Sequence, residues 1–249
     1  MKRGYVLHHR PYRESSALVN LLVDGVGRVD AVARLGSGKR SIKSILQPFQ
    51  PLIFEFSGKS ELKNLTQIEA AAPAIPLSGY SLYAGMYINE LLMRTLSVHH
   101  NAEALFFIYH QSLIALATEF CESKLRYLEL ALLRELGAMP SLIRDTQGEP
   151  LMSDYFYQLI PEHGFQFVLN SRARHAYQGE MLIALNDNQL IEPQFMSAKR
   201  LMRAMLQPLL GNKPLVSRQL FINAAHSTNS TSLISSTNAT KSQPNTGNN

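Results

Sequence analysis

The sequence contains very little cysteine and no long apolar run, and both absences limit what the chain can be. Cys121 is the single cysteine, so an internal disulfide and a cysteine-only zinc site are excluded. It lies in a helical pattern, which favours a structural thiol over a nucleophile. The apolar runs end well before the roughly 18 residues that span a membrane, and the amino terminus lacks a charged-then-apolar signal segment. We therefore expect a cytoplasmic protein.

Motifs that carry catalytic chemistry are missing as well. There is no H-E-x-x-H, G-x-S-x-G or G-x-G-x-x-G spacing. The stretch "RLGSGKRS" is similar to a phosphate-binding loop, but Ala33 stands where the first glycine is required, and Arg40 stands where a hydroxyl would hold magnesium. The adjacent histidine pairs point their side chains in different directions and make poor metal platforms. We therefore expect no catalytic residue, metal or cofactor, with a nucleotide-dependent enzyme as an alternative to be tested.

Positive charge is concentrated in the first third of the chain. Residues 1–78 contain 11 Lys and Arg against 6 Asp and Glu, whereas residues 79–249 contain 13 of each. Two stretches contain cations and no acids. One holds Arg34, Lys39, Arg40 and Lys43, and the other holds Lys199, Arg200, Arg203, Lys213 and Arg218. Clustered charge of one sign attracts polyanions, of which nucleic acid is the commonest, although a merely solvated face would look the same.

The first third also shows the alternation of short strands. Strand patterns occur at 5–9, 19–23, 29–33, 52–56 and 62–69. Asp24-Gly25 is a hairpin signal, and one or two helical turns are expected at 41–47, before Pro48. Five strands with a helical insert after the third predict an OB-fold barrel over 1–78, which binds oligonucleotides on one face. An SH3-like barrel would give a similar pattern.

Helical periodicity replaces the strand pattern after a proline-containing linker at 73–79. Apolar residues recur at helical spacing over 83–94, 105–116 and 125–136, and Gly137 follows as a helix terminator. Residues 140–180 look irregular, and a further helix is expected at 195–209, before Gly211. The prediction is an α+β protein whose second domain, 79–223, is mostly helical.

The carboxyl-terminal segment has a different composition. From His226 to Asn249, 16 of the 24 residues are Ser, Thr or Asn. Such a segment buries too little apolar surface to offset the entropy of ordering it, so 224–249 is predicted to be a disordered tail.

Several strings together resemble one bacterial family, the RecO recombination mediators. They occur in the family's order over nearly all of residues 4–222: "VLHHRPYRESSALVNLL", "GRVDAVARLG", "LQPFQPLIFEFSGKSELKNL", "YINELL", "LELALLRELG" and "GNKPLVSRQLF". The resemblance implies an amino-terminal OB-fold, a helical domain and a nucleoid-associated role in recombinational DNA repair. It also implies binding of single- and double-stranded DNA, annealing of complementary strands, docking on the tail of single-stranded-DNA-binding protein (SSB), and loading of RecA together with RecR.

One departure from the family concerns zinc. Many members resemble a zinc protein after the "LG", with two cysteine pairs, but here Arg144 and Gln147 stand where the first pair would be. We therefore predict a degenerate, zinc-free module within 140–180. Its expected packing residues are Tyr155, Phe156, Phe165 and Phe167.

The DNA site expected from charge and resemblance lies on the barrel. It comprises Arg10, Arg13, Arg28, Arg34, Lys39, Arg40 and Lys43. Tyr12 or Tyr5 is a candidate for stacking on a base, although a core position fits each tyrosine equally well. An RNA-binding OB protein without a repair role is the alternative function.

The SSB-tail site expected from the resemblance lies in the helical domain. It comprises Arg126, with Lys199 and Arg203 lining the same groove. An acidic, aromatic-ended peptide requires a cation beside an apolar pocket. The alternative for Arg126 is an ordinary surface pair with Glu122, four residues earlier on the same helix.

Overall fold

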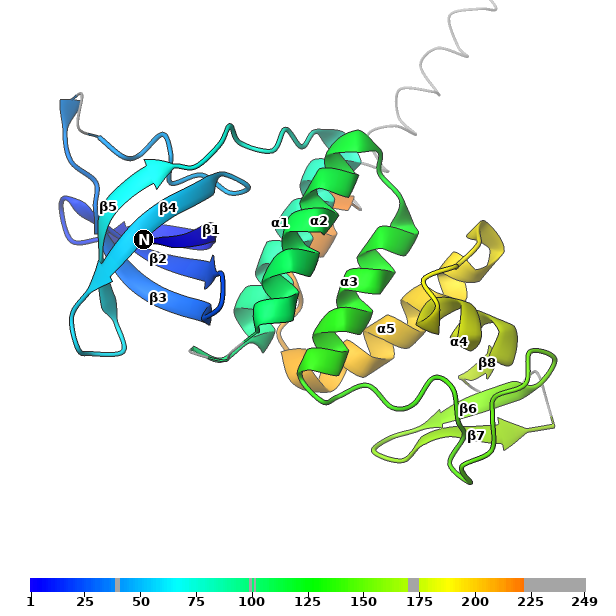
Figure 1. Cartoon of the computed structure of the whole chain (residues 1–249). Helices are drawn as coiled ribbons and strands as arrows, with labels where there is room; N and C mark the ends of the chain where they lie inside the picture. The colour runs from blue at the N-terminus through cyan, green and yellow to red at the C-terminus, as the bar shows by residue number, and fades with distance from the viewer. Residues whose placement is uncertain (39–40, 99, 101, 170–174, 222–249) are drawn as a thin grey trace, which may run out of the picture.

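The computed structural model describes residues 1–38, 41–98, 100, 102–169 and 175–221. The chain forms a closed barrel, then a group of helices, with a small sheet at the far end of the molecule (Figure 1). The barrel strands are β1 (Lys2–Tyr12), β2 (Ser16–Val23), β3 (Gly27–Arg34), β4 (Pro51–Ser57) and β5 (Lys63–Ala70). The tail predicted at 224–249 lies outside the described residues.

The barrel is the predicted OB-fold. Its strand order is β1-β2-β3-β5-β4, and β3 runs parallel to β5 while the other neighbours are antiparallel. Alternate residues of β2 point inward, so Val19, Leu21 and Val23 are fully buried together with Leu52 and Phe54. The helical insert after β3 is reduced to one turn, in which the amides of 45 and 46 donate to the carbonyl of 42.

The helices follow the predicted periodicity except at 179–186, where no helix was expected. They are α1 (Gly79–Thr95), α2 (Glu103–Thr118), α3 (Glu122–Glu135), α4 (Gly179–Asn186) and α5 (Phe195–Leu210), with a 3-10 turn, η2 (Glu192–Gln194), before α5. Gly137 follows α3 at φ 64°, a left-handed conformation that favours glycine, as expected for a helix terminator. Leucines of α1, α2, α3 and α5 form one core.

The stretch 140–180, expected to be irregular, contains a three-stranded antiparallel sheet. Its strands are β6 (Phe156–Ile160), β7 (Gly164–Val168) and β8 (Ala176–Gln178), in the order β7-β6-β8. Of the four predicted packing residues only Phe165 is fully buried, whereas Tyr155 and Phe167 are exposed and pack on each other, with ring centroids 5.1 Å apart. The register places Tyr157 opposite Tyr177, and these two tyrosines form the buried aromatic core together with Phe165.

Hydrogen bonds hold the turn where the first cysteine pair would be. The Asp145 carboxylate accepts from the amides of Gln147, at 2.9 Å, and Glu149, at 3.0 Å. The Arg144 guanidinium donates to the carbonyl of Gly148 at 2.7 Å. These bonds close the turn through groups of the protein itself. The absence of zinc stays a prediction.

The barrel and the helices share a core. Tyr5 and Leu22, on the outer face of the barrel, belong to the same buried cluster as Ile88 and Tyr109 of the helices. The Tyr5 hydroxyl lies 2.5 Å from Nδ1 of His110, and burial raises the pKa of Tyr5 to about 12. Tyr5 is 2% exposed and is not available to a base, so the packing alternative is correct for this residue.

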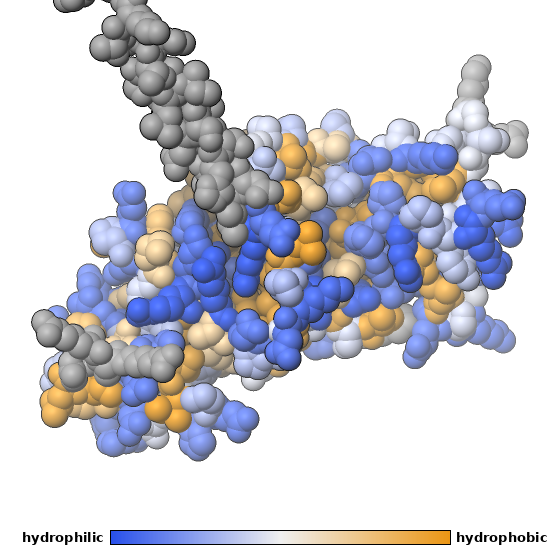
Figure 2. Space-filling view, turned by 180° about the vertical axis from the view of Figure 1, so that it is seen from behind, coloured by the Kyte–Doolittle hydropathy of each residue, from blue (hydrophilic) through white to orange (hydrophobic). Residues whose placement is uncertain are grey.

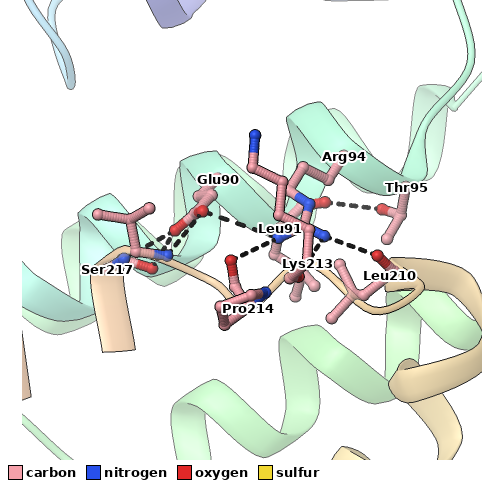
Figure 3. A network of polar contacts seen from close by, with 9 residues as sticks. Glu90, Leu91, Arg94, Thr95, Leu210, Lys213, Pro214 and Ser217 are labelled. Atoms are coloured by element: carbon pink, nitrogen blue, oxygen red, sulfur yellow. Dashed lines mark hydrogen bonds and ion pairs between the residues drawn. The ribbon is translucent and has the colours of Figure 1, made fainter. Parts of the chain in front are cut away.

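A clamp on α1 fixes the segment that follows α5 (Figure 3). The Arg94 guanidinium donates to the carbonyls of Leu210, Lys213 and Pro214 at 2.6–3.0 Å. One turn earlier, the Glu90 carboxylate accepts from the Val216 and Ser217 amides and the Ser217 hydroxyl at 2.6–2.9 Å. Burial alone would raise the pKa of Glu90, but these hydrogen bonds and Arg94 lower it below its ordinary value.

Candidate nucleic-acid interface

One half of the outer barrel face is free of the helices. Strand register places Tyr12 opposite Ser16 and Ser16 opposite Arg34, so these three side chains share one outward-facing row. The next outward row contains Arg10 and Leu18 of β1 and β2 with Val32 of β3. The β2–β3 face and the β1–β2 hairpin are the surfaces with which OB-folds bind oligonucleotides. The sequence-predicted cations Arg10 and Arg34 are therefore brought together on this face.

Cations on this face lack acidic partners. Arg10, Arg34 and Lys43 are exposed, and among the described residues none forms an ion pair or a hydrogen bond with the charged group of any of them; the hydrogen bonds of Lys43 with Ser41 and Gln47 involve its backbone. Arg13, in the β1–β2 hairpin, is also exposed and lies over the Tyr12 ring, 5.2 Å from its centroid. Uncompensated cations beside a half-buried tyrosine suit a phosphate backbone with a base stacked nearby.

Helical-domain cations are mostly engaged within the protein. Beyond Arg94, Lys124 donates to two carbonyls at the end of α2, and Arg134 donates to Asn186. Arg200 donates to the carbonyl of Ala176 at 2.8 Å. The two acid-free stretches of the sequence therefore differ in structure. Arg34 and Lys43 of the first face solvent, whereas Lys199 and Arg200 of the second are bound within the protein.

Arg28 does not fit the predicted DNA site. Its guanidinium donates to the carbonyls of Met93 and Leu96, at 2.6 and 2.8 Å, and pairs with Asp30 at 3.3 Å. The arginine thus joins β3 to the end of α1. It belongs to the interface between the barrel and the helices, because the outward face of the barrel is covered there.

The basic loop that contains Lys43 leaves β3 at the end that bears Arg34. The Leu35 amide donates to the Ser15 carbonyl at 2.9 Å, and the Ile42 amide donates to the Leu35 carbonyl at 3.0 Å. These bonds bring the loop's return point beside the β1–β2 hairpin, so Lys43 lies near the end of the strand that bears Arg34. The predicted contacts Lys39 and Arg40 lie outside the described residues.

Two residues on or near this face were not predicted. His8 pairs with Asn20 in the outward row that follows the row of Arg10, and it is exposed. Lys59 is exposed in the β4–β5 loop, a second loop that OB-folds use for binding. Alternation along β1 would have indicated His8, but the bulge between Val6 and His8 shifts the alternation at that point.

The residues of the predicted partner site lie on α3 and α5, and they differ in accessibility. Arg126 is 4% exposed and pairs with Glu129 at 3.0 Å, and Tyr87 donates a hydrogen bond to the same carboxylate. Lys199 pairs with Glu122 at 2.7 Å. The surface pair between Glu122 and Arg126, the alternative from sequence, is therefore wrong.

Arg203 is the accessible cation of this group. It is exposed on α5, yet its charge reaches Glu129 together with that of Arg218. Burial raises the pKa of the Glu129 carboxyl, and Arg126, the Tyr87 hydrogen bond and the two further arginines oppose that rise. Arg218 lies over the Tyr87 ring at 5.8 Å and was not predicted as part of this group.

The described residues form neither a metal-binding cluster nor a membrane-spanning helix. No three His, Cys, Asp or Glu side chains in these ranges gather closely enough to hold a metal ion. No helix in the described part of the chain is both long and apolar enough to cross a membrane.

Fold and site together define a class: an OB-fold protein with an uncompensated basic face, joined to a helical domain. Comparison with protein families gives two matches, Recombination protein O N terminal over residues 1–74 and Recombination protein O C terminal over residues 77–219. The chain belongs to the RecO family of DNA repair proteins.

The sequence of the chain is similar to curated relatives along most of their length. The DNA repair protein RecO of Pseudoalteromonas atlantica is 41% identical over 222 residues, covering 88% of this chain and 92% of the relative. The protein of the same name from Stutzerimonas stutzeri is 42% identical over 225 residues, covering 90% and 94%. The one from Serratia proteamaculans is 41% identical over 227 residues, covering 88% and 92%.

Proposed function

We propose that the chain is a non-catalytic mediator of recombinational DNA repair that holds DNA on the free half of the barrel face. The observation that carries this proposal is the group of exposed cations without acidic partners, formed by Arg10, Arg13, Arg34 and Lys43. Single- and double-stranded DNA are both substrates, because the contacts are to phosphate and require no particular base sequence.

Strand annealing follows from the same contacts. A protein that holds strands by their phosphates lowers the repulsion between two strands and leaves most base edges free to pair. The half-buried Leu18 and Val32 between the cations offer an apolar floor rather than a set of hydrogen-bonding groups. Sequence-specific readout would require such groups, so annealing of any complementary pair is expected.

The test compares the wild-type protein with the double variant Arg10→Ala/Arg34→Ala. We expect the variant to bind DNA at least tenfold more weakly and to anneal complementary strands more slowly, because two phosphate contacts are lost. Lys213→Gln removes an exposed charge from the helical domain and serves as the control. Unchanged annealing by the double variant would refute the proposal, and a strong preference for RNA over DNA of equal length would favour the RNA-binding alternative.

For the partner site we propose that Arg203, with Lys199 beside it, receives the acidic tail of SSB. Arg126 acts as a positioning residue, because its guanidinium is buried against Glu129 rather than turned to solvent. Cooperation with RecR and RecA loading, in the cytoplasm at the nucleoid, completes the proposed role.

Binding of an SSB tail peptide tests the role proposed for Arg203. Arg203→Ala is expected to weaken binding of an SSB tail peptide several-fold while leaving the melting temperature within a degree or two, because the side chain is exposed. Gln207→Ala, one turn further along α5 and also exposed, is the matched control. Equal affinities of the Arg203 variant and the wild type would remove Arg203 from the site.

A further inference from the structure

A pocket of about 540 Å³ lies on the side of the helical domain next to the small sheet. Three segments form it: the connection leaving α3, the β6–β7 hairpin and the second half of α5. Its size is within the range of ligand pockets. The lining is mostly apolar, with Met139, Leu159, Ile160, Met205 and Leu209 among its residues. Apolar side chains also reach the surface at the small-sheet end of the molecule (Figure 2).

The lining of this pocket carries a negative charge. Glu162 is the one charged side chain in the lining, it is exposed, and no described residue forms an ion pair with it. Gly137 and Ala138, which also line the pocket, directly follow the carboxyl-terminal end of α3, where a helix carries partial negative charge. An anionic peptide would therefore meet repulsion here, in contrast to the basic face of the barrel.

The pocket also contains a backbone acceptor without its helical donor. Pro208 lies within α5, and its nitrogen has no hydrogen to give to the carbonyl of Ala204, four residues earlier. Both residues line the pocket. Ala204 and Pro208 are both exposed, so this carbonyl is open to a donor from water or from a ligand.

From these features we infer that the pocket is a docking site for a basic-apolar peptide segment of a protein partner. An apolar side chain fills the pocket, a flanking Lys or Arg meets Glu162, and a donor of the segment reaches the Ala204 carbonyl. Arg203, which is proposed to receive the acidic SSB tail, precedes the lining residue Ala204 on α5 but does not itself line this pocket. Such docking goes beyond the DNA-binding role.

The test uses the acetylated and amidated tripeptide Arg-Trp-Arg as the probe, with Glu-Trp-Glu as its charge-reversed counterpart. The chain has no tryptophan, so indole fluorescence reports on the peptide alone. We expect saturable binding of Arg-Trp-Arg to the full-length protein, with a blue shift of its emission as the indole leaves water. Glu-Trp-Glu is expected to bind at least tenfold more weakly.

Two variants assign the binding to this pocket. Ala204→Phe fills the space and is expected to abolish saturable binding. Glu162→Gln is expected to weaken it about threefold, the size typical of one partly exposed charge pair. Glu192→Gln removes an exposed carboxylate that does not line the pocket and is expected to leave affinity unchanged.

Two results would overturn the inference. Unchanged affinity in folded Ala204→Phe overturns the inference, as does equal or tighter binding of Glu-Trp-Glu, which would assign the pocket to an acidic ligand instead. If Ala204→Phe loses its far-ultraviolet circular dichroism, Glu162→Lys decides, because this residue lies at an exposed hairpin tip. A loss of tenfold or more in that variant supports the inference, and no loss overturns it.

Discussion

The salt dependence of single-strand binding tests the barrel face directly. The four exposed cations Arg10, Arg13, Arg34 and Lys43 are each expected to neutralise one phosphate. Each neutralised phosphate of a single strand contributes about −0.7 to the slope of log affinity against log salt concentration. The four together predict a slope of about −3, and further contacts from the loop would make it steeper.

Replacing Arg10 and Arg34 by alanine isolates two of these contacts. The slope is expected to become shallower by about 1.4, and this difference does not depend on how many other phosphates the protein touches. With four contacts, raising the salt from 50 to 200 mM weakens wild-type binding about 50-fold, and with two contacts about sevenfold. Fluorescence anisotropy of a labelled oligothymidylate over a potassium chloride series measures both slopes.

The control is Lys213→Gln, which removes one exposed charge outside the barrel. Its slope is expected to match that of the wild type. The proposed phosphate contacts of Arg10 and Arg34 are refuted if the double variant keeps the wild-type slope, or if the control changes the slope by as much per charge as the double variant does. A lower affinity with an unchanged slope would indicate that the arginines support the fold of the barrel rather than contact phosphate.

The remaining predictions concern stability, each measured by urea denaturation. Glu90→Gln is expected to cost about 1–2 kcal/mol at pH 7, because hydrogen bonds to a charged acceptor are weakened. Since the folded state lowers the pKa of Glu90, this advantage exists above the unfolded pKa and disappears as the pH falls through the folded pKa, so the two proteins should converge in acid. Gly27→Ala should cost about 3 kcal/mol or more, because a Cβ would lie 1.7 Å from the His100 carbonyl oxygen at φ 87°; Gly25→Ala, with open space at φ 65°, should cost about 1 kcal/mol. Arg126→Ala should cost about 3 kcal/mol or more, because it leaves Glu129 buried without its partner. A change of only a degree or two in melting temperature would contradict this buried structural role of Arg126.

Local pattern was sufficient for most of the architecture. Alternation along Val19, Leu21 and Val23 indicated which residues fill the barrel, since side chains of a strand point to opposite faces in turn. Helical spacing located α1, α2 and α3, because apolar residues three or four positions apart lie on one face of a helix. The small sheet was missed because proline and glycine interrupt its short strands, and the burial of Tyr157 and Tyr177 depends on a pairing between segments that no single window of sequence contains.

The candidate sites were harder to predict because charge in a sequence does not say where a side chain points. Arg28 and Arg34 occupy the same strand and look alike in composition. Only the packing of the barrel on the end of α1 directs Arg28 to the carbonyls of Met93 and Leu96 while Arg34 remains in solvent. The direction of the Arg126 side chain was also not predictable. The sequence suggested a pair with Glu122, whereas the structure shows a pair with Glu129, three residues along the helix.

The sequence by itself determined the two-part organisation, the barrel core and the excess of positive charge in the first third of the chain, because these follow from periodicity and composition. The tertiary structure decided which cations are available to a ligand and which hold segments together. The physical reason is that the cost of removing a cation from water depends on its distant neighbours. A guanidinium brought against carbonyls and carboxylates stabilises the fold, whereas one left on an open strand face can bind phosphate.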